Sequence, residues 1–75
     1  MTAAEFTAAT TALQARHGLS DAAMAAYLGV PVQTWRHWRR GDRAPARVAV
    51  RLVEVLGLIE ALAPGVHAAL LPSAA

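Results

Sequence analysis

Residues 21–41 read DAAMAAYLGVPVQTWRHWRRG, and this stretch decides the fold that we predict. Apolar residues recur at helical spacing on both sides of Gly29. Gly29 can take the positive φ angle that a tight turn requires, and the small Ala25 lets two helices approach closely. We therefore predict helices at residues 21–28 and 31–40, joined by a tight turn.

Two tryptophans dominate the second of these helices. Trp35 and Trp38 lie three positions apart, so they share one helix face, and their burial would hold the helix rigidly. Stacking on unpaired bases is the alternative, but the register places both rings where the helix pair needs apolar contacts. Tyr27, in the preceding helix, is expected at the edge with its hydroxyl in water. The side chains left on the outer face of the second helix are those of Val32, Gln33, Arg36, His37 and Arg40.

This outer face carries groups that can read base pairs in the major groove of DNA. Gln33 can form a bidentate pair with adenine, and Val32 can contact a thymine methyl group. Arg36 or His37 can donate hydrogen bonds to guanine. The simpler alternative is an ordinary polar helix surface.

Positive charge is concentrated just after this face. The 75-residue chain has a net charge of +2, and all seven of its basic residues are arginines. Six of the seven lie in residues 36–51, where Asp42 is the only acid. One-sided arginine of this kind favours binding to phosphate groups, although a solvated helix end is the plainer interpretation.

The sequence before this stretch predicts an N-terminal helix at residues 2–16. Thr2 and Glu5 fit a capping box, in which each side chain bonds the backbone of the other. Gly18 fits a left-handed cap at the end of this helix, and Ser20 fits the N-cap of the next one. The expected buried stripe consists of Phe6, Ala9, Ala12 and Leu13.

The sequence after it predicts one longer helix and a short one. Pro45 fits the first position of a helix, and Gly57 either ends this helix or lies inside it at a cost of about 1 kcal/mol relative to alanine. Residues 64–65 are Pro-Gly, which break the helix; residues 66–71 predict a further turn, and residues 72–75 a frayed end. The apolar face of the longer helix is expected to contain Val48, Leu52, Val55, Leu56, Ile59 and Leu62.

The length of the chain predicts one domain over residues 1–75, and the expected helices make it all-α, a compact bundle of four or five helices. A chain this short buries about 60% of its unfolded surface, so a second copy is the expected extra source of stability. The absence of cysteine excludes disulfides and cysteine–zinc sites. No long apolar run and no signal peptide is apparent, so we expect a cytoplasmic protein without a membrane partner.

Catalytic chemistry finds little support in the residue types. The chain has no lysine and two serines, and its five carboxylates are scattered. His17, His37 and His67 do not show metal-ligand spacing. We therefore expect no enzyme, no cofactor and no bound metal.

The segment LSDAAMAAYLGVPVQTWRHWRRGDRAP, residues 19–45, resembles the lambda-repressor-like, Xre-type helix-turn-helix regulators. The resemblance extends over residues 13–59 and includes the small repressors of phages, those beside anti-CRISPR genes, and antitoxin-type autoregulators. It implies a homodimer that binds an inverted-repeat operator in double-stranded DNA. The residues that carry it are Ala25, Gly29, Trp35, Trp38 and Gly41.

The resemblance also implies a role for individual residues. Val32, Gln33 and His37 match positions that contact bases, and Arg36 lies on the neighbouring turn, where it would contact a base or a phosphate. The implied phosphate contacts are Ser20, Arg39, Arg40, Arg43 and Arg47. Our candidates for the dimer surface are Val55, Ile59, Leu62, Val66 and Leu70.

Two features depart from the family pattern. Asp21 stands where the family often has glutamine, and a carboxylate repels phosphate unless its backbone N–H makes the contact. The family also often pairs an arginine of the first helix with a glutamate before the loop, and these positions hold Gln14 and Arg39 here. Arg39 is then left with three possible partners: Glu54, Asp42 or a phosphate.

The function that we predict is a sequence-specific, DNA-binding repressor or autoregulator. An antitoxin-type module that binds a toxin or another protein is the first alternative, and an exposed apolar strip on the C-terminal helix would favour it. An excisionase-like architectural DNA binder is the second alternative. It requires a β-hairpin after Gly41, and the helical period through residues 48–59 argues against one.

Overall fold

The computed structural model describes residues 1–72 as five α-helices joined by short connections. No strand occurs in this part of the chain, which confirms the all-α prediction and excludes a β-hairpin in the described residues after Gly41. Residues 73–75, where we predicted a frayed end, lie outside the described residues. The helices are α1 (Ala3–His17), α2 (Asp21–Leu28), α3 (Val32–Arg40), α4 (Arg47–Leu62) and α5 (Pro64–Leu70).

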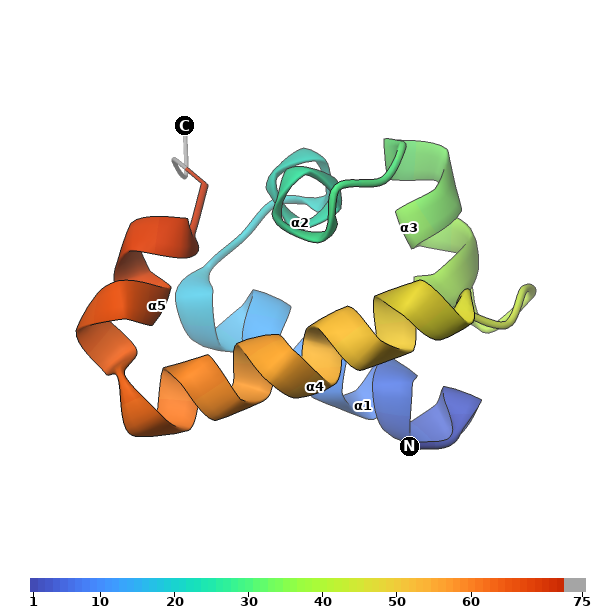
Figure 1. The fold of residues 1–75 in the computed structure, drawn as a ribbon. Helices are drawn as coiled ribbons and strands as arrows, with labels where there is room; N and C mark the ends of the chain where they lie inside the picture. Colours follow the sequence, from blue (N-terminus) through green and yellow to red (C-terminus); the bar gives the residue numbers. More distant parts are fainter. Residues whose placement is uncertain (73–75) are drawn as a thin grey trace.

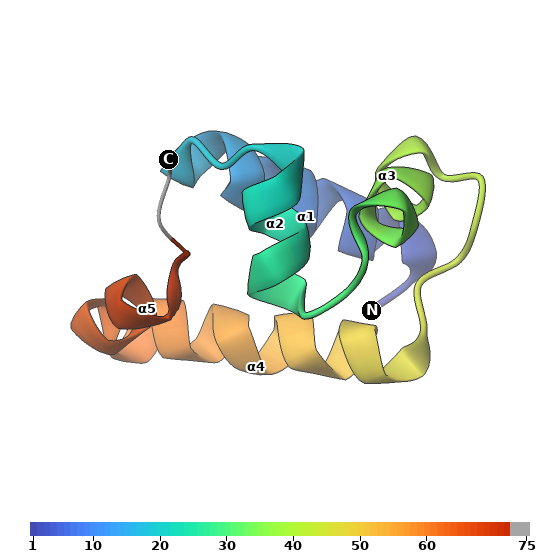
Figure 2. The same ribbon diagram turned by 90° about the horizontal axis from the view of Figure 1, so that it is seen from above.

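The two long helices frame the molecule. α1 and α4 run along opposite edges when the molecule is viewed from above, with α2 between them and α3 overlapping the N-terminal part of α1 (Figure 2). α4 crosses the whole molecule, from the end of α3 to α5, which folds back beside its last turn (Figure 1). The helix pair α2–α3 is therefore supported on two sides, whereas α5 sits at one end.

The helix ends follow the predicted caps. The Thr2 hydroxyl accepts a hydrogen bond from the Glu5 backbone N–H, and the Thr2 backbone N–H donates to the Glu5 carboxylate at 2.7 Å, which completes the capping box. The Ser20 hydroxyl accepts from the Ala23 N–H at 3.1 Å. Gly18 takes a φ of 62°, the left-handed conformation predicted for it.

Two helices begin later than predicted. Pro31 and Pro45 were expected at first helical positions, but Pro31 is an N-cap and Pro45 precedes the N-cap Ala46. Pro31 and Ala46 have the extended ψ angle of 147°. Each nevertheless accepts the first hydrogen bond of its helix through its carbonyl oxygen, from Trp35 and Val50 respectively. Neither of these helices has a side-chain cap.

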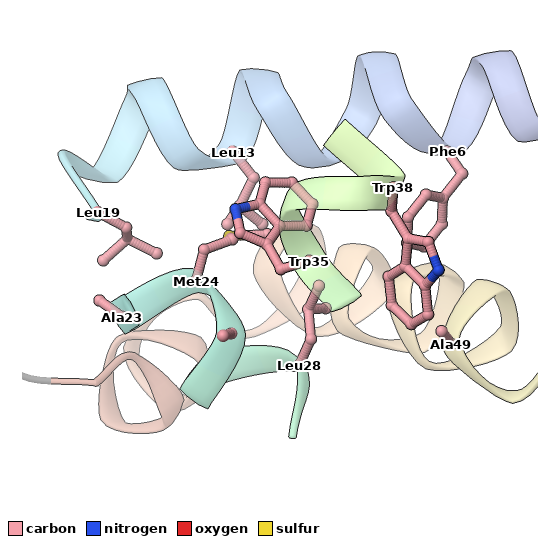
Figure 3. Close-up of a cluster of buried hydrophobic side chains, with 10 residues drawn as sticks. Phe6, Leu13, Leu19, Ala23, Met24, Leu28, Trp35, Trp38 and Ala49 are labelled. Carbon is pink, nitrogen blue, oxygen red and sulfur yellow. The ribbon is translucent and has the colours of Figure 1, made fainter. Parts of the chain in front are cut away.

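The core is built around the two tryptophans of α3, as predicted. Trp35 is fully buried, and the Trp38 ring meets the ring of Phe6 edge-on with 5.7 Å between the centroids. Figure 3 shows both rings lying against α1, with Ala49 of α4 beside Trp38. The other apolar side chains of this cluster are Leu13, Leu19, Ala23, Met24, Ala25 and Leu28.

The buried stripe of α1 differs from the prediction in its polar member. Ala9 is half-buried and Ala12 is exposed, while Thr10 is almost completely buried. The Thr10 hydroxyl donates to the backbone carbonyl of Phe6 at 2.7 Å. Because this bond satisfies the hydroxyl within its own helix, a threonine can occupy a core position.

The inner face of α4 is also not the one that we predicted. The helix continues through Gly57 to Leu62, and its buried side chains are Ala49 and Leu56. Val48 and Leu62 were expected in the core but are each 81% exposed. The helical period was correct, but α4 has more apolar positions than its neighbours can cover. Of the remaining predicted positions, Val55 is exposed and Leu52 and Ile59 are half-buried.

Candidate nucleic-acid interface

The turn between α2 and α3 is built by Gly29 in the left-handed conformation, with a φ of 71°. The Gly29 N–H donates to Ala26 and the Val30 N–H donates to Ala25, so the last carbonyls of α2 are satisfied. Val30 and Pro31 separate Gly29 from α3, which runs in a new direction; Figure 1 looks along α2 while α3 runs across that view. This is the predicted pair of crossed helices.

The outer face of α3 is accessible to different degrees. Gln33 is exposed, and Arg36 and His37 are half-buried. Val32 is also half-buried because it packs against the edge of the core. The four predicted base-reading residues therefore lie on one helix, with Gln33 the most accessible of them.

Asp21, at the start of α2, binds side chains of α1 and α3 beside this face. Its carboxylate accepts hydrogen bonds from Gln14 of α1 at 3.0 Å and from the indole N–H of Trp35 at 3.1 Å. It also pairs with Arg39, whose Nη1 lies 2.7 and 2.9 Å from the two oxygens, and more distantly with Arg36, at 3.4 Å. The two departures from the family pattern are therefore parts of one network that ties α3 to α1 and α2.

The partner of Arg39 corrects the prediction. Of the acids considered, neither Glu54 nor Asp42 is the one that it contacts; it pairs with Asp21, 18 positions earlier in the chain. Helical periodicity places residues within one helix, but it does not show which ends of different helices meet. Arg39 is half-buried, so its guanidinium is partly committed to the fold.

The network changes the acidity of Asp21. The hydrogen bond from Gln14 is the largest cause that lowers the pKa of this carboxyl below its ordinary value of 3.8, followed by Trp35, Arg39 and Arg36, while burial opposes them. The carboxylate is thus ionised and accepts hydrogen bonds from four side chains. Its repulsion of a nearby phosphate would be offset by the two guanidinium groups.

A second, exposed carboxylate lies just after the C-terminal end of α3. Asp42 bonds His37 Nδ1 at 3.1 Å and Arg40 Nη2 at 3.2 Å. The hydrogen bonds from His37 and then from Arg40 lower the pKa of Asp42. Two residues predicted to contact DNA are therefore held by an acid at the surface.

The remaining predicted phosphate ligands are freer. Arg43 and Arg47 are exposed, and within residues 1–72 neither lies within ion-pair distance of a carboxylate. Ser20 is exposed as well; its oxygen caps α2 as an acceptor, which leaves the hydroxyl proton able to donate. Arg43 and Arg47 lie on the connection after α3 and on the first turn of α4.

An exposed apolar strip covers the outer side of α4 and α5. Four of the five predicted dimer residues are exposed in it, and Ile59 is half-buried. Leu58, which we did not predict, is 58% exposed. Its spacing from Val55 and Leu62 is helical, so periodicity could have identified it. The strip consists of Val55, Leu58, Leu62, Val66 and Leu70.

A polar cluster that we did not predict lies where α1, α4 and α5 meet. His67 of α5 is buried, and its Nε2 lies 2.8 Å from the Tyr27 hydroxyl, which we had expected in water. His17, at the end of α1, bonds Glu60 of α4. His17 precedes Glu60 by 43 positions, so spacing could not have shown that His17 converges with Glu60 and His67.

Comparison with known proteins adds no relative: no family model, no curated protein and no solved structure matches this chain. None of the helices described in residues 1–72 combines enough length with enough apolar character to cross a bilayer.

Proposed function

We propose that this protein is a sequence-specific, double-stranded-DNA-binding repressor or autoregulator that acts as a homodimer. One observation carries the proposal: the buried tryptophans fix α3 so that its opposite face points outward, and free arginines border that face. A rigid helix with polar side chains outward fits the major groove, which is wide enough to admit a helix.

The arginines would supply affinity. Arg43 and Arg47 have no acidic partner in the described chain, so a phosphate oxygen would be their first ionic contact. Each phosphate that a protein neutralises releases counterions from DNA, so binding weakens as salt rises. Arg40 would join them on exchanging Asp42 for phosphate, and Ser20 would donate its hydroxyl at the start of α2.

The outer residues of α3 would supply sequence discrimination. Gln33 is exposed near the start of α3, where a glutamine amide can pair with adenine through two hydrogen bonds. His37 lies one turn further along with one ring nitrogen held by Asp42, which orients the imidazole. Arg36 has two possible roles. From its contact with Asp21 its guanidinium would reach either a base edge or the DNA backbone.

The exposed apolar strip would form the dimer surface. A chain of this size gains stability by covering such a strip, because burial removes its apolar area from water. Two copies related by a two-fold axis would present two α3 helices to half-sites about 34–36 Å apart. An inverted repeat in the DNA would match that symmetry.

Selection from a random double-stranded DNA pool, followed by gel shifts at several salt concentrations, tests the proposal. We expect an inverted repeat to emerge, and Arg43→Gln to weaken specific and random DNA equally, with the salt slope reduced by about 1. Gln33→Ala should instead lose about 1–3 kcal/mol of discrimination at one base pair. Arg16→Gln, which alters an arginine bonded to Glu60 on α4, serves as the matched control. Failure to enrich any sequence would refute specific binding.

The apolar strip also favours a second candidate, an antitoxin-type module that binds another protein. Both candidates predict that the strip is covered, but by different partners. Sedimentation of the pure protein separates them: a dimer at micromolar concentration supports self-association. A monomer that binds no DNA would favour the protein-binding module.

A further inference from the structure

The three-residue cluster of His17, Glu60 and His67 carries an inference that is independent of DNA binding. We propose that these residues form a binding site for a divalent metal ion of the zinc class. One ligand atom from each residue lies within 4.8 Å of the other two. The three residues come from α1, α4 and α5, so the ion would join three helices.

The distances between the ligand atoms are close to those of a metal site. His17 Nε2 lies 2.6 Å from Glu60 Oε2, and His67 Nδ1 lies 4.0 Å from the same oxygen. Zinc holds nitrogen and oxygen ligands at about 2.0–2.2 Å in a tetrahedron, which places them roughly 3–3.5 Å from one another. Small side-chain adjustments would convert the present cluster into that geometry.

The donor set also fits zinc. Two imidazole nitrogens and one carboxylate oxygen are borderline ligands of the kind that bind Zn²⁺ with three protein ligands and one water. His17 and Glu60 are each about one-quarter exposed, which leaves solvent access for the ion and for the fourth ligand. His67 is buried and supplies the rigid side of the site.

Tyr27 would act as the supporting partner of the site. Its hydroxyl lies 2.8 Å from His67 Nε2, the ring nitrogen that does not face Glu60. A metal-bound histidine usually gives its second N–H to an acceptor, which fixes the tautomer and the ring orientation. With Nε2–H donating to Tyr27, the lone pair of Nδ1 is left for the metal.

Arg16 is the group that opposes a cation here. Its Nη2 lies 2.7 Å from Glu60 Oε1, and its Nε lies 3.4 Å from Oε2, the oxygen that faces the histidines. The Arg16 side chain is half exposed, so it can withdraw into solvent when the ion enters. Removing the charge of Arg16 should therefore strengthen metal binding. If the Arg16–Glu60 ion pair served only to stabilise the fold, its removal would not increase the affinity for zinc.

Calorimetric titration of the untagged 75-residue chain with ZnCl₂ tests the proposal. We expect one zinc per chain, a melting temperature that rises with zinc concentration, and a cobalt(II) derivative with the visible absorption of a tetrahedral site. His17→Gln and Glu60→Gln should each abolish tight binding. Tyr27→Phe should weaken it about 10–100-fold, and Arg16→Gln should strengthen it.

His37→Gln is the matched control, because His37 also bonds a carboxylate, Asp42, but belongs to no group of three possible ligands within residues 1–72. It should bind zinc like the unchanged protein. His17 and Glu60 lie at the rim, so their variants are expected to fold, which circular dichroism checks. Absence of one-to-one binding, or equal binding by His17→Gln and the unchanged chain, would overturn the proposal.

Discussion

The α2–α3 pair and the α4–α5 pair are packed in opposite ways. The first pair contributes most of the core and buries both tryptophans, Met24 and Leu28. The second pair contributes two buried apolar side chains and a buried histidine, and leaves a long apolar strip exposed. The first pair therefore buries its large apolar side chains within the monomer, whereas the second pair leaves apolar surface exposed that a partner could cover.

Removing an aromatic ring from the first pair should have the largest effect. Trp38→Ala leaves a cavity beside Phe6, and we expect a loss of about 3–5 kcal/mol in the free energy of unfolding. Domains of this size have little more stability than that, so most molecules would unfold. Urea titration followed by circular dichroism measures the loss.

The control for Trp38→Ala is Val48→Ala in α4. Val48 is 81% exposed, so this change should alter stability by no more than about 0.5 kcal/mol. If Trp38→Ala had the same free energy of unfolding as the unchanged protein, the α2–α3 pair would not carry the core.

Asp21→Asn should have the next largest effect. The substitution breaks the ion pairs with Arg39 and Arg36, and it makes the acceptor of the Gln14 and Trp35 hydrogen bonds neutral. Hydrogen bonds to a charged group contribute about 1.5–3 kcal/mol each, and less where solvent screens them. We expect a net loss of about 1.5–3 kcal/mol at neutral pH, measured by thermal or urea unfolding.

The same substitution gives a test by pH. The pKa of Asp21 is lowered in the folded state, so its stabilisation is complete above the ordinary value of 3.8 and is lost as the pH falls through the lower, folded value. The stability of the unchanged protein should therefore converge toward that of Asp21→Asn in this acid range. Parallel curves would show that the ionisation of Asp21 does not contribute to stability.

Gly57→Ala should strengthen the second pair by a smaller amount. Gly57 is an interior residue of α4, and a methyl group there meets no atom within 4 Å. Alanine favours the helix by about 1 kcal/mol over glycine, so the melting temperature should rise. Gly29→Ala is the contrasting variant; its φ of 71° is strained for alanine, and it should destabilise by about 1–2 kcal/mol.

Leu62→Gln should have the smallest effect on folding and a clear one on association. Leu62 is 81% exposed, so the monomer loses almost no packing. Sedimentation equilibrium should show a weaker dimer for this variant, with an unchanged melting temperature at low concentration. Equal dimerisation by both proteins would place the interface elsewhere.

Most of the fold could be predicted because its signals are local. Caps, left-handed glycines and the tryptophan register each depend on a few neighbouring residues, and they located the α2–α3 turn and the inward rings. The inner face of α4 could not be predicted in the same way. All its apolar positions satisfy the helical period, and which of them are buried depends on where α4 crosses α1 and α2.

The residues of the candidate site also differ in whether local sequence signals could predict their positions. Helical register alone puts Val32, Gln33, Arg36 and His37 on one side of α3, opposite the tryptophans. The Asp21–Arg39 pair and the Tyr27–His67 bond join different helices, and no spacing rule connects such residues. Asp21 could be recognised as unusual from its mismatch to the resembled pattern, but its partner required the structure.

The Asp21 network has a consequence for the order in which the chain folds. Its bonds join residues 7 to 18 positions apart, whereas Glu60 bonds residues 43 and 44 positions away. Closing the shorter loops costs less entropy, so the α2–α3 pair should form before α4 and α5 dock. Substitutions at Asp21 would then slow folding, and substitutions at Glu60 would mainly accelerate unfolding.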